Sequence, residues 1–156
     1  MNIVIFCSGV RGLAVFWHLV NTGHKVSDVI TSETSNGGEI WRSVGDTGTR
    51  IHHIQDVNAP KFLSQLSSLL PDIIVSAGFS QIFCPELISI PTLGAINLHA
   101  GPLPTYRGGS PLNWQMINGE DTAGLSAILM DEGIDTGPVL AKTSFPIDPG
   151  DDIATL

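Results

Sequence analysis

Two polar side chains and a group of carboxylates with complementary chemistry stand out in the C-terminal half of the sequence. Asn97 and His99 lie two residues apart in the otherwise apolar run Ala95–His99, and carboxylates follow in the segment 131–135. Side chains two apart on a strand share one face, so Asn97 and His99 should project together where the strand ends. An Asn amide can donate to a developing oxyanion, and a histidine exchanges a proton near neutrality. A neighbouring carboxylate would orient the ring, and the set predicts acyl-type transfer.

The same residue types also have explanations without catalysis. An Asn on a buried strand often only satisfies backbone groups, and a lone histidine is commonly structural. The carboxylates could instead hold a metal ion, but no further ligands with suitable spacing accompany them, and we expect no metal. Spacing alone therefore leaves the catalytic and the structural explanation open.

The elements that would position these residues alternate along the chain. Four buried strands are expected as apolar runs, and helices with apolar residues at helical spacing separate them. Two later strands are joined by a short turn and should pair antiparallel. The sequence predicts an α/β fold with a mostly parallel sheet and an antiparallel edge, with polar side chains at strand ends where such sheets open a crevice. The expected strands are 2–7, 26–31, 73–77, 95–99, 123–130 and 138–144, and the expected helices are 12–22, 58–70 and 110–118.

Two segments in the first third of the chain are less regular. The segment 32–50 is rich in Ser, Thr and Gly and is predicted as a long loop that borders the site, before a short strand over 50–54. The turn at 9–12 suits either a plain strand-to-helix connection or a site where the helix N-terminus, with Gly9 and Arg11, binds a substrate phosphate. It does not match G-x-G-x-x-G, so a dinucleotide-dependent oxidoreductase has only this turn in its favour.

Composition narrows the partners and the compartment. The chain has 156 residues, 15 acidic and seven basic, with a net charge of −8, so a nucleic-acid partner is not expected. The two cysteines, Cys7 and Cys84, are expected to be reduced thiols. With no signal-peptide pattern and no apolar run of the length that a membrane span needs, we expect a cytoplasmic protein. One domain is expected, and 150–156 resembles the first turn of a further helix, so residues 1–156 are predicted to be a domain truncated at its C-terminal helix.

Three ordered motifs carry a resemblance to a known family. The run 97–111, N-L-H-A-G-P-L-P-T-Y-R-G-G-S-P, resembles the signature loop of the folate-dependent formyltransferases. The run 131–137, D-E-G-I-D-T-G, resembles the second signature of that family, and 77–83 resembles its pterin-contacting loop. The resemblance implies a Rossmann-like three-layer formyltransferase fold and an enzyme that transfers a one-carbon group from 10-formyltetrahydrofolate.

The resemblance also implies roles for individual residues. Asn97, His99 and Asp135 match the catalytic triad of the family. A substrate amine would attack the formyl carbon, while Asn97 and a protonated His99 stabilise the tetrahedral oxyanion. Asp135 would hold His99 and help to move the proton of the attacking ammonium, through water.

The same resemblance assigns the binding residues. The pterin would be bound largely through backbone groups of two loops, and the acceptor by the signature loop and by the turn after the first strand. The residues implied for the pterin are Ser80, Gln81, Ile82, Phe83, Asp131, Glu132 and Ile134, and those implied for the acceptor are Gly9, Arg11, Pro104, Tyr106 and Arg107.

The acceptor amine is assigned from finer features. The segment 106–114 looks closer to the sugar N-formyltransferases than to the tRNA enzymes. The negative net charge of the chain also favours a sugar acceptor, and the segment 32–50 lacks the basic insertion expected of a tRNA clamp. The D-x-G-x-D-T-G motif is equally typical of the catalytic domain of methionyl-tRNA formyltransferase. We therefore predict a nucleotide-linked amino sugar as acceptor. The alternative acceptors are methionyl-tRNA and another small amine, and the chain could instead be a folate-binding remnant without activity. The oligomeric state is left open, with a homodimer as one option.

Overall fold

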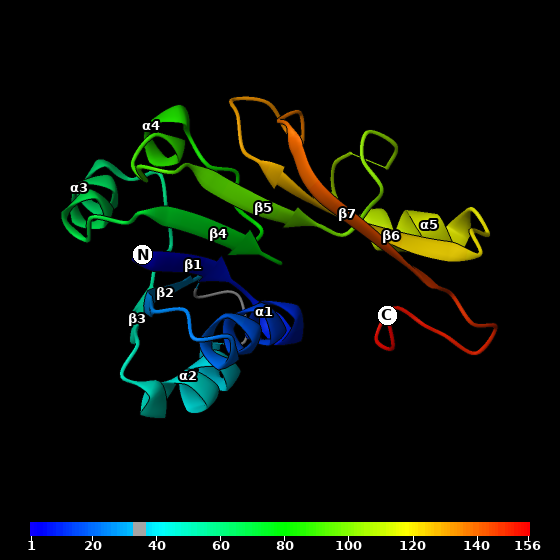
Figure 1. Ribbon diagram of the computed structural model, residues 1–156, viewed down its shortest axis with the longest axis horizontal. Helices are drawn as coiled ribbons and strands as arrows, with labels where there is room; N and C mark the ends of the chain where they lie inside the picture. The colour runs from blue at the N-terminus through cyan, green and yellow to red at the C-terminus, as the bar shows by residue number, and fades with distance from the viewer. Residues whose placement is uncertain (33–36) are drawn as a thin grey trace. The chain divides into compact units, whose positions relative to one another are not determined.

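The computed structural model describes residues 1–32 and 37–156, whose contacts form two compact units, Met1–Ile96 and Asn97–Leu156. Seven strands of this described part form one sheet in the order β3-β2-β1-β4-β5-β6-β7 (Figure 1), which confirms the predicted α/β fold. The strands are β1 (Ile3–Cys7), β2 (Val26–Thr31), β3 (Arg50–His53), β4 (Ile73–Ala77), β5 (Ala95–His99), β6 (Thr122–Leu129) and β7 (Val139–Pro146). The helices are α1 (Gly9–Asn21), α2 (Gly37–Val44), α3 (Pro60–Ser68), α4 (Pro85–Ile88) and α5 (Pro111–Ile117), with a 3₁₀ turn η1 (Gly45–Thr47).

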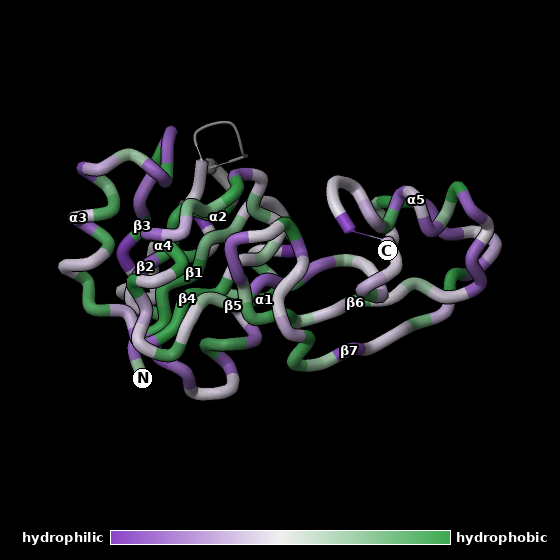
Figure 2. Tube along the Cα trace, turned by 90° about the horizontal axis from the view of Figure 1, so that it is seen from above, coloured by the Kyte–Doolittle hydropathy of each residue, from purple (hydrophilic) through white to green (hydrophobic). Residues whose placement is uncertain are grey.

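The first unit is built on a parallel sheet covered by helices on both faces. Strand β1 pairs in parallel with β2 and β4, and β2 pairs in parallel with β3. Alternate residues of β1 face opposite layers. Ile5 belongs to the cluster that buries the apolar residues of α1 and α2, whereas the Phe6 ring lies edge-on to Phe62 of α3, with centroids 6.2 Å apart. Figure 2 shows the hydrophobic strands β1 and β4 in the interior of this unit.

The prediction of a long loop over 32–50 is wrong in its second half. Residues 37–44 form α2, and residues 45–47 form η1. Ile40 and Val44 lie four residues apart on α2 and are fully buried, so one apolar face holds the helix against the core. The flanking glycines and serines concealed this short pattern. Residues 33–36 and the side chain of Trp41 lie outside the described part of the chain.

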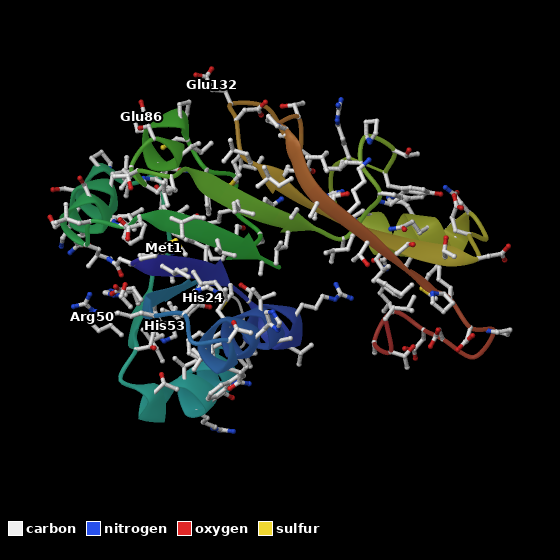
Figure 3. The ribbon with its side chains drawn as sticks, in the orientation of Figure 1. Met1, His24, Arg50, His53, Glu86 and Glu132 are labelled. Carbon is white, nitrogen blue, oxygen red and sulfur yellow. The ribbon has the colours of Figure 1, made fainter. Side chains whose placement is uncertain are left out.

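A buried carboxylate joins β2 to β3 at the edge of the first unit. Asp28 is fully buried and accepts hydrogen bonds from Arg50 Nε at 2.8 Å and Nη2 at 2.9 Å, and His52 Nε2 lies 2.7 Å from Oδ1. Burial alone would raise the pKa of Asp28, but the hydrogen bonds from Arg50 and His52 outweigh it and hold that pKa below its usual range. Figure 3 shows Arg50 at this edge of the unit.

The second unit contains an antiparallel hairpin, as predicted. Strands β6 and β7 pair antiparallel, with Leu125 opposite Thr143 and Ser126 opposite Lys142. The side chain of Gln115 on α5 accepts a hydrogen bond from the backbone of Gly124 on β6, and this contact fastens the helix to the hairpin. Residues 152–155 form a hydrogen-bonded turn, and the predicted truncation at a further helix stays a prediction.

No helix of the described residues combines the length and the apolar character that a membrane crossing requires.

Asp28 should contribute to stability in a pH-dependent way. Because its pKa is lower in the folded chain than in the unfolded one, its contribution is complete above the unfolded pKa of about 3.9 and is lost as the pH falls through the folded pKa. The substitution Asp28→Asn should lower the free energy of unfolding by about 2 kcal/mol at pH 7. Urea titrations should show the gap to the unmodified chain closing below about pH 4. The exposed Asp121→Asn is the control, and a gap that does not narrow as the pH falls below about 4 would contradict the assignment.

Candidate active site

The end of β5 places two of the predicted catalytic side chains beside the third. Asn97 Nδ2 donates to Asp135 Oδ1 at 3.2 Å, and His99 Nδ1 lies 3.3 Å from Asp135 Oδ2. All three residues belong to the second unit. The structure therefore brings together Asn97, His99 and Asp135, whose catalytic roles stay predictions.

The His99 ring is held at both nitrogens. Its Nδ1 faces the carboxylate of Asp135, and its Nε2 lies 2.8 Å from the backbone carbonyl oxygen of Tyr106. Both partners are acceptors, and only the imidazolium has an N–H on each nitrogen to donate to them. With the residue only 6% exposed, the ring has a defined place between these two partners.

Asp135 reaches the histidine because its loop has an unusual backbone conformation. Its φ is +53°, in the left-handed region, and its Oδ2 also accepts from Gly108 N at 3.1 Å. Within the loop, Asp131 Oδ1 accepts from Gly133 N at 3.0 Å and from Thr136 Oγ1 at 2.6 Å. Internal hydrogen bonds thus fix the loop that presents Asp135.

Two glycines of this loop occupy places where no side chain fits. A Cβ on Gly133 would overlap the Thr136 side chain, and a Cβ on Gly137 would overlap the carbonyl oxygen of Leu129. The close approach explains the Gly residues of the D-E-G-I-D-T-G motif.

The backbone after His99 is supported by two buried polar side chains that the sequence analysis missed. Ser126 Oγ donates to Gly101 O at 2.7 Å and accepts from Leu103 N at 3.1 Å. Gln115 Nε2 donates to Ala100 O at 2.9 Å. Both side chains are fully buried. The sequence features that could have identified these two residues are a serine within an apolar strand and a glutamine on the apolar face of a helix.

The predicted acceptor residues of the signature loop differ in their surroundings. Pro104 and Arg107 are exposed. Tyr106 is half-buried, and its hydroxyl is already engaged by Glu120 and Asn118. Pro104 and Arg107 are thus accessible to a ligand, whereas the hydroxyl of Tyr106 already makes hydrogen bonds within the unit.

The predicted pterin residues fall into two groups, one in each unit. In the first unit, the amide of Gln81 bonds to the backbone of Gln55 and Val57, and Phe83 is buried against Phe6 with ring centroids 4.7 Å apart. Ser80 and Ile82 of this group are exposed. In the second unit, the exposed residues are Asp131, Glu132 and Ile134, and Figure 3 shows Glu132 pointing outward from its loop.

The turn before α1 has one feature of an anion site. Gly9 adopts a φ of +61° at the helix N-terminus, and the neighbouring Ser8 has a buried Oγ without a hydrogen-bond partner among the described residues. Binding of a substrate phosphate here, with Arg11, stays a prediction.

Comparison with known proteins identifies the family. A family model described as "Formyl transferase" matches residues 52–156. The chain belongs to the formyl transferase family. This membership confirms the predicted family of one-carbon transferases.

The relatives of this chain include a curated protein named "Methionyl-tRNA formyltransferase" from Trichlorobacter lovleyi. It is 45% identical over 109 residues, which are 70% of this chain and 34% of the relative. The chain spans less than half the length of the curated relatives that it matches.

Solved structures confirm the predicted fold. The phosphoribosylglycinamide formyltransferase of Bacillus halodurans superimposes with a TM-score of 0.84 at 22% identity, over 99% of this chain and 84% of that chain. A sugar N-formyltransferase from Shewanella sp. FDAARGOS_354 gives a TM-score of 0.73 at 25% identity, over 95% of this chain and 58% of that one.

Ser126 should contribute measurably to the stability of the loop. The substitution Ser126→Ala leaves the carbonyl of Gly101 and the N–H of Leu103 without their buried partner, at a cost of about 2 kcal/mol in the free energy of unfolding. Urea unfolding at pH 7 measures the cost. The control is Ser144→Ala on the exposed strand β7, which should change the free energy little. Equal effects in the two variants would contradict the role of Ser126.

Proposed function

We propose that this chain carries the catalytic residues of a formyltransferase that moves a formyl group from 10-formyltetrahydrofolate to a primary amine. The observation that supports the proposal most is the convergence of Asn97 and His99 on the carboxylate of Asp135. An amide donor, an imidazolium and a carboxylate are the groups that addition of an amine to a formyl carbon requires.

Asn97 stabilises the negative charge that develops on the formyl oxygen. An amide nitrogen has two hydrogens, and the contact with Asp135 Oδ1 uses one of them. The second hydrogen donates to the oxyanion. A donor of this kind lowers the barrier by about 3–4 kcal/mol in comparable oxyanion holes.

His99 and Asp135 control the protons of the reaction. Attack forms a bond between the amine nitrogen and the formyl carbon, and collapse of the intermediate breaks the bond from that carbon to N10 of the folate. The proton lost by the attacking ammonium passes, through water beside Asp135, to the departing nitrogen. A protonated His99, whose two N–H groups donate to Asp135 and to the carbonyl of Tyr106, stabilises the oxyanion through its positive charge, and Asp135 orients the ring.

The pterin-binding role predicted for two loops is kept for the exposed residues of each unit taken by itself. In the second unit these are Asp131, Glu132 and Ile134. In the first unit these are Ser80 and Ile82, because Gln81 and Phe83 are held within the unit.

The comparisons favour methionyl-tRNA over the nucleotide-linked amino sugar that we predicted from the sequence. The curated relatives at 45–49% identity bear the name methionyl-tRNA formyltransferase, whereas the sugar N-formyltransferase is 25% identical. The acidic charge was a weak argument against a tRNA acceptor, because the chain covers less than half of those relatives. We therefore propose the amino group of methionyl-tRNA as acceptor, with the amino sugar as the second candidate.

An acceptor screen tests this choice. The chain is incubated with 10-formyltetrahydrofolate and, in separate reactions, with methionyl-tRNA, nucleotide-linked 4-amino sugars and glycinamide ribonucleotide. We expect mass spectrometry to find one added formyl group on methionine released from the tRNA. A formylated sugar without formylmethionine would overturn the acceptor. No product with any amine, despite tight folate binding in calorimetry, would favour a folate-binding remnant.

Loss of the His99 ring should abolish turnover and leave the fold intact. For His99→Ala we expect kcat to fall by about 10²–10⁴, with the circular dichroism spectrum and the affinity for the folate donor little changed. The exposed His24→Ala on the first unit is the matched control and should keep full activity. Turnover of His99→Ala at the rate of the unmodified chain would refute the mechanism.

A further inference from the structure

The backbone carbonyl that holds His99 comes from a residue in a costly conformation. Tyr106 has a φ of +44°, in the left-handed region, where a non-glycine residue loses roughly 1–2 kcal/mol. Its carbonyl oxygen lies 2.8 Å from His99 Nε2. The surrounding structure must hold Tyr106 in place for this contact to persist.

Hydrogen bonds of the phenol hold Tyr106 in this conformation. Its hydroxyl donates to Glu120 Oε1 at 2.5 Å and accepts from Asn118 Nδ2 at 2.9 Å. The hydroxyl thus uses one donor and one acceptor function. The hydrogen bond to Glu120 raises the pKa of Tyr106, so the phenol remains a donor across the neutral range.

Glu120 is itself fixed by the way in which α5 ends. Gly119 has a φ of +70°, its N–H donates to Met116 O at 3.0 Å, and Glu120 N donates to Gln115 O at 3.1 Å. This hydrogen-bond pattern is a Schellman motif. The carboxylate of Glu120 therefore projects from a backbone position that the helix determines.

Gly101 lies close to both the His99 ring and the carbonyl of Tyr106. A Cβ on Gly101 would stand 3.0 Å from His99 Nε2 and 3.1 Å from Tyr106 O. The ring, the carbonyl and Gly101 are thus in close contact, and a shift of Tyr106 would be felt at Nε2.

We propose that Glu120 is a positioning residue for His99, acting through the phenol and the carbonyl of Tyr106. The proposal rests on the proposed function, in which His99 stabilises the oxyanion. It is separate from the role of Tyr106 in substrate binding, which stays a prediction: the side chain faces α5, and the carbonyl faces the catalytic ring. Asp135 orients the ring from Nδ1, and the Glu120–Tyr106 pair orients it from Nε2.

Four variants of the full chain test the proposal by kinetics. Glu120→Ala and Tyr106→Phe each remove the hydrogen bond, and each should lower kcat by about tenfold, equivalent to about 1.4 kcal/mol, with KM for the folate donor unchanged. Glu120→Gln keeps an acceptor oxygen and should retain most of the activity. The control is Asp121→Ala, which removes the adjacent exposed carboxylate and should keep full activity. The double variant Glu120→Ala/Tyr106→Phe should be no slower than either single variant, because both act on one contact.

A ring signal tests the same contact without turnover. In ¹H–¹⁵N NMR spectra of the imidazole groups, assigned with His99→Ala, we expect the Nε2–H of His99 to be protected from exchange in the unmodified chain and in Glu120→Gln. In Glu120→Ala and Tyr106→Phe the signal should shift and exchange faster. An unchanged signal in both variants, or an equal loss of kcat in Asp121→Ala, would overturn the positioning role. If no acceptor is formylated, the proposed function fails while the ring signal still decides whether Glu120 positions His99.

Discussion

The carboxylate of Asp135 joins its own loop to the end of β5 and to the loop that follows β5. It meets the amide of Asn97, the ring of His99 and the backbone N–H of Gly108. An ionised carboxylate only accepts hydrogen bonds, and its two oxygens have room for all three partners. Without it, a nearly buried ring nitrogen would lose its partner, at a cost of about 1–3 kcal/mol. The catalytic arrangement and the local fold therefore depend on the same atoms.

The irregular backbone after β5 creates the need for buried polar side chains around it. A strand satisfies its carbonyls through neighbouring strands, but the chain leaves the sheet after His99. The carbonyls of Ala100 and Gly101 are satisfied instead by Gln115 and Ser126. Leaving such groups unpaired in the interior would cost more than these side chains lose on burial. A loop that departs from regular structure to present a carbonyl to His99 thus requires polar support from α5 and β6.

The sequence predicted most elements because their apolar patterns are long and regular. The two-residue period of β5 was enough to place Asn97 and His99 on one face, and the proline and glycine signals bounded α3 and α5. Helix α2 was missed because its apolar pattern is short: among the side chains that the structure describes in it, Ile40 and Val44 are the buried ones. Short patterns of this kind are decided by tertiary packing.

The site was predicted less completely, since its contacts cross between elements. Asp135 was assigned through the family resemblance, because no local periodicity links it to a histidine 36 positions earlier. For Tyr106, whose predicted role in binding the acceptor stays a prediction, the sequence does not reveal that its hydroxyl donates to Glu120 just after α5. The amide of Gln115 and the hydroxyl of Ser126 lie at positions where periodicity predicts apolar core residues, and their hydrogen bonds to the backbone of the loop and of β6 explain them.

Acceptor choice and chemistry are separable in this arrangement. In the proposed mechanism, Asn97, His99 and Asp135 act on the formyl oxygen, the amine nitrogen and their protons, which every acceptor in this reaction shares. Selection then has to use side chains that project beyond these atoms, and in the signature loop the exposed ones include Pro104 and Arg107. A guanidinium binds the phosphates of a nucleotide sugar and of a tRNA end equally well. If Arg107 contacts the acceptor as predicted, its charge favours phosphate-bearing acceptors as a class, and the shape of the surface around it has to distinguish between them.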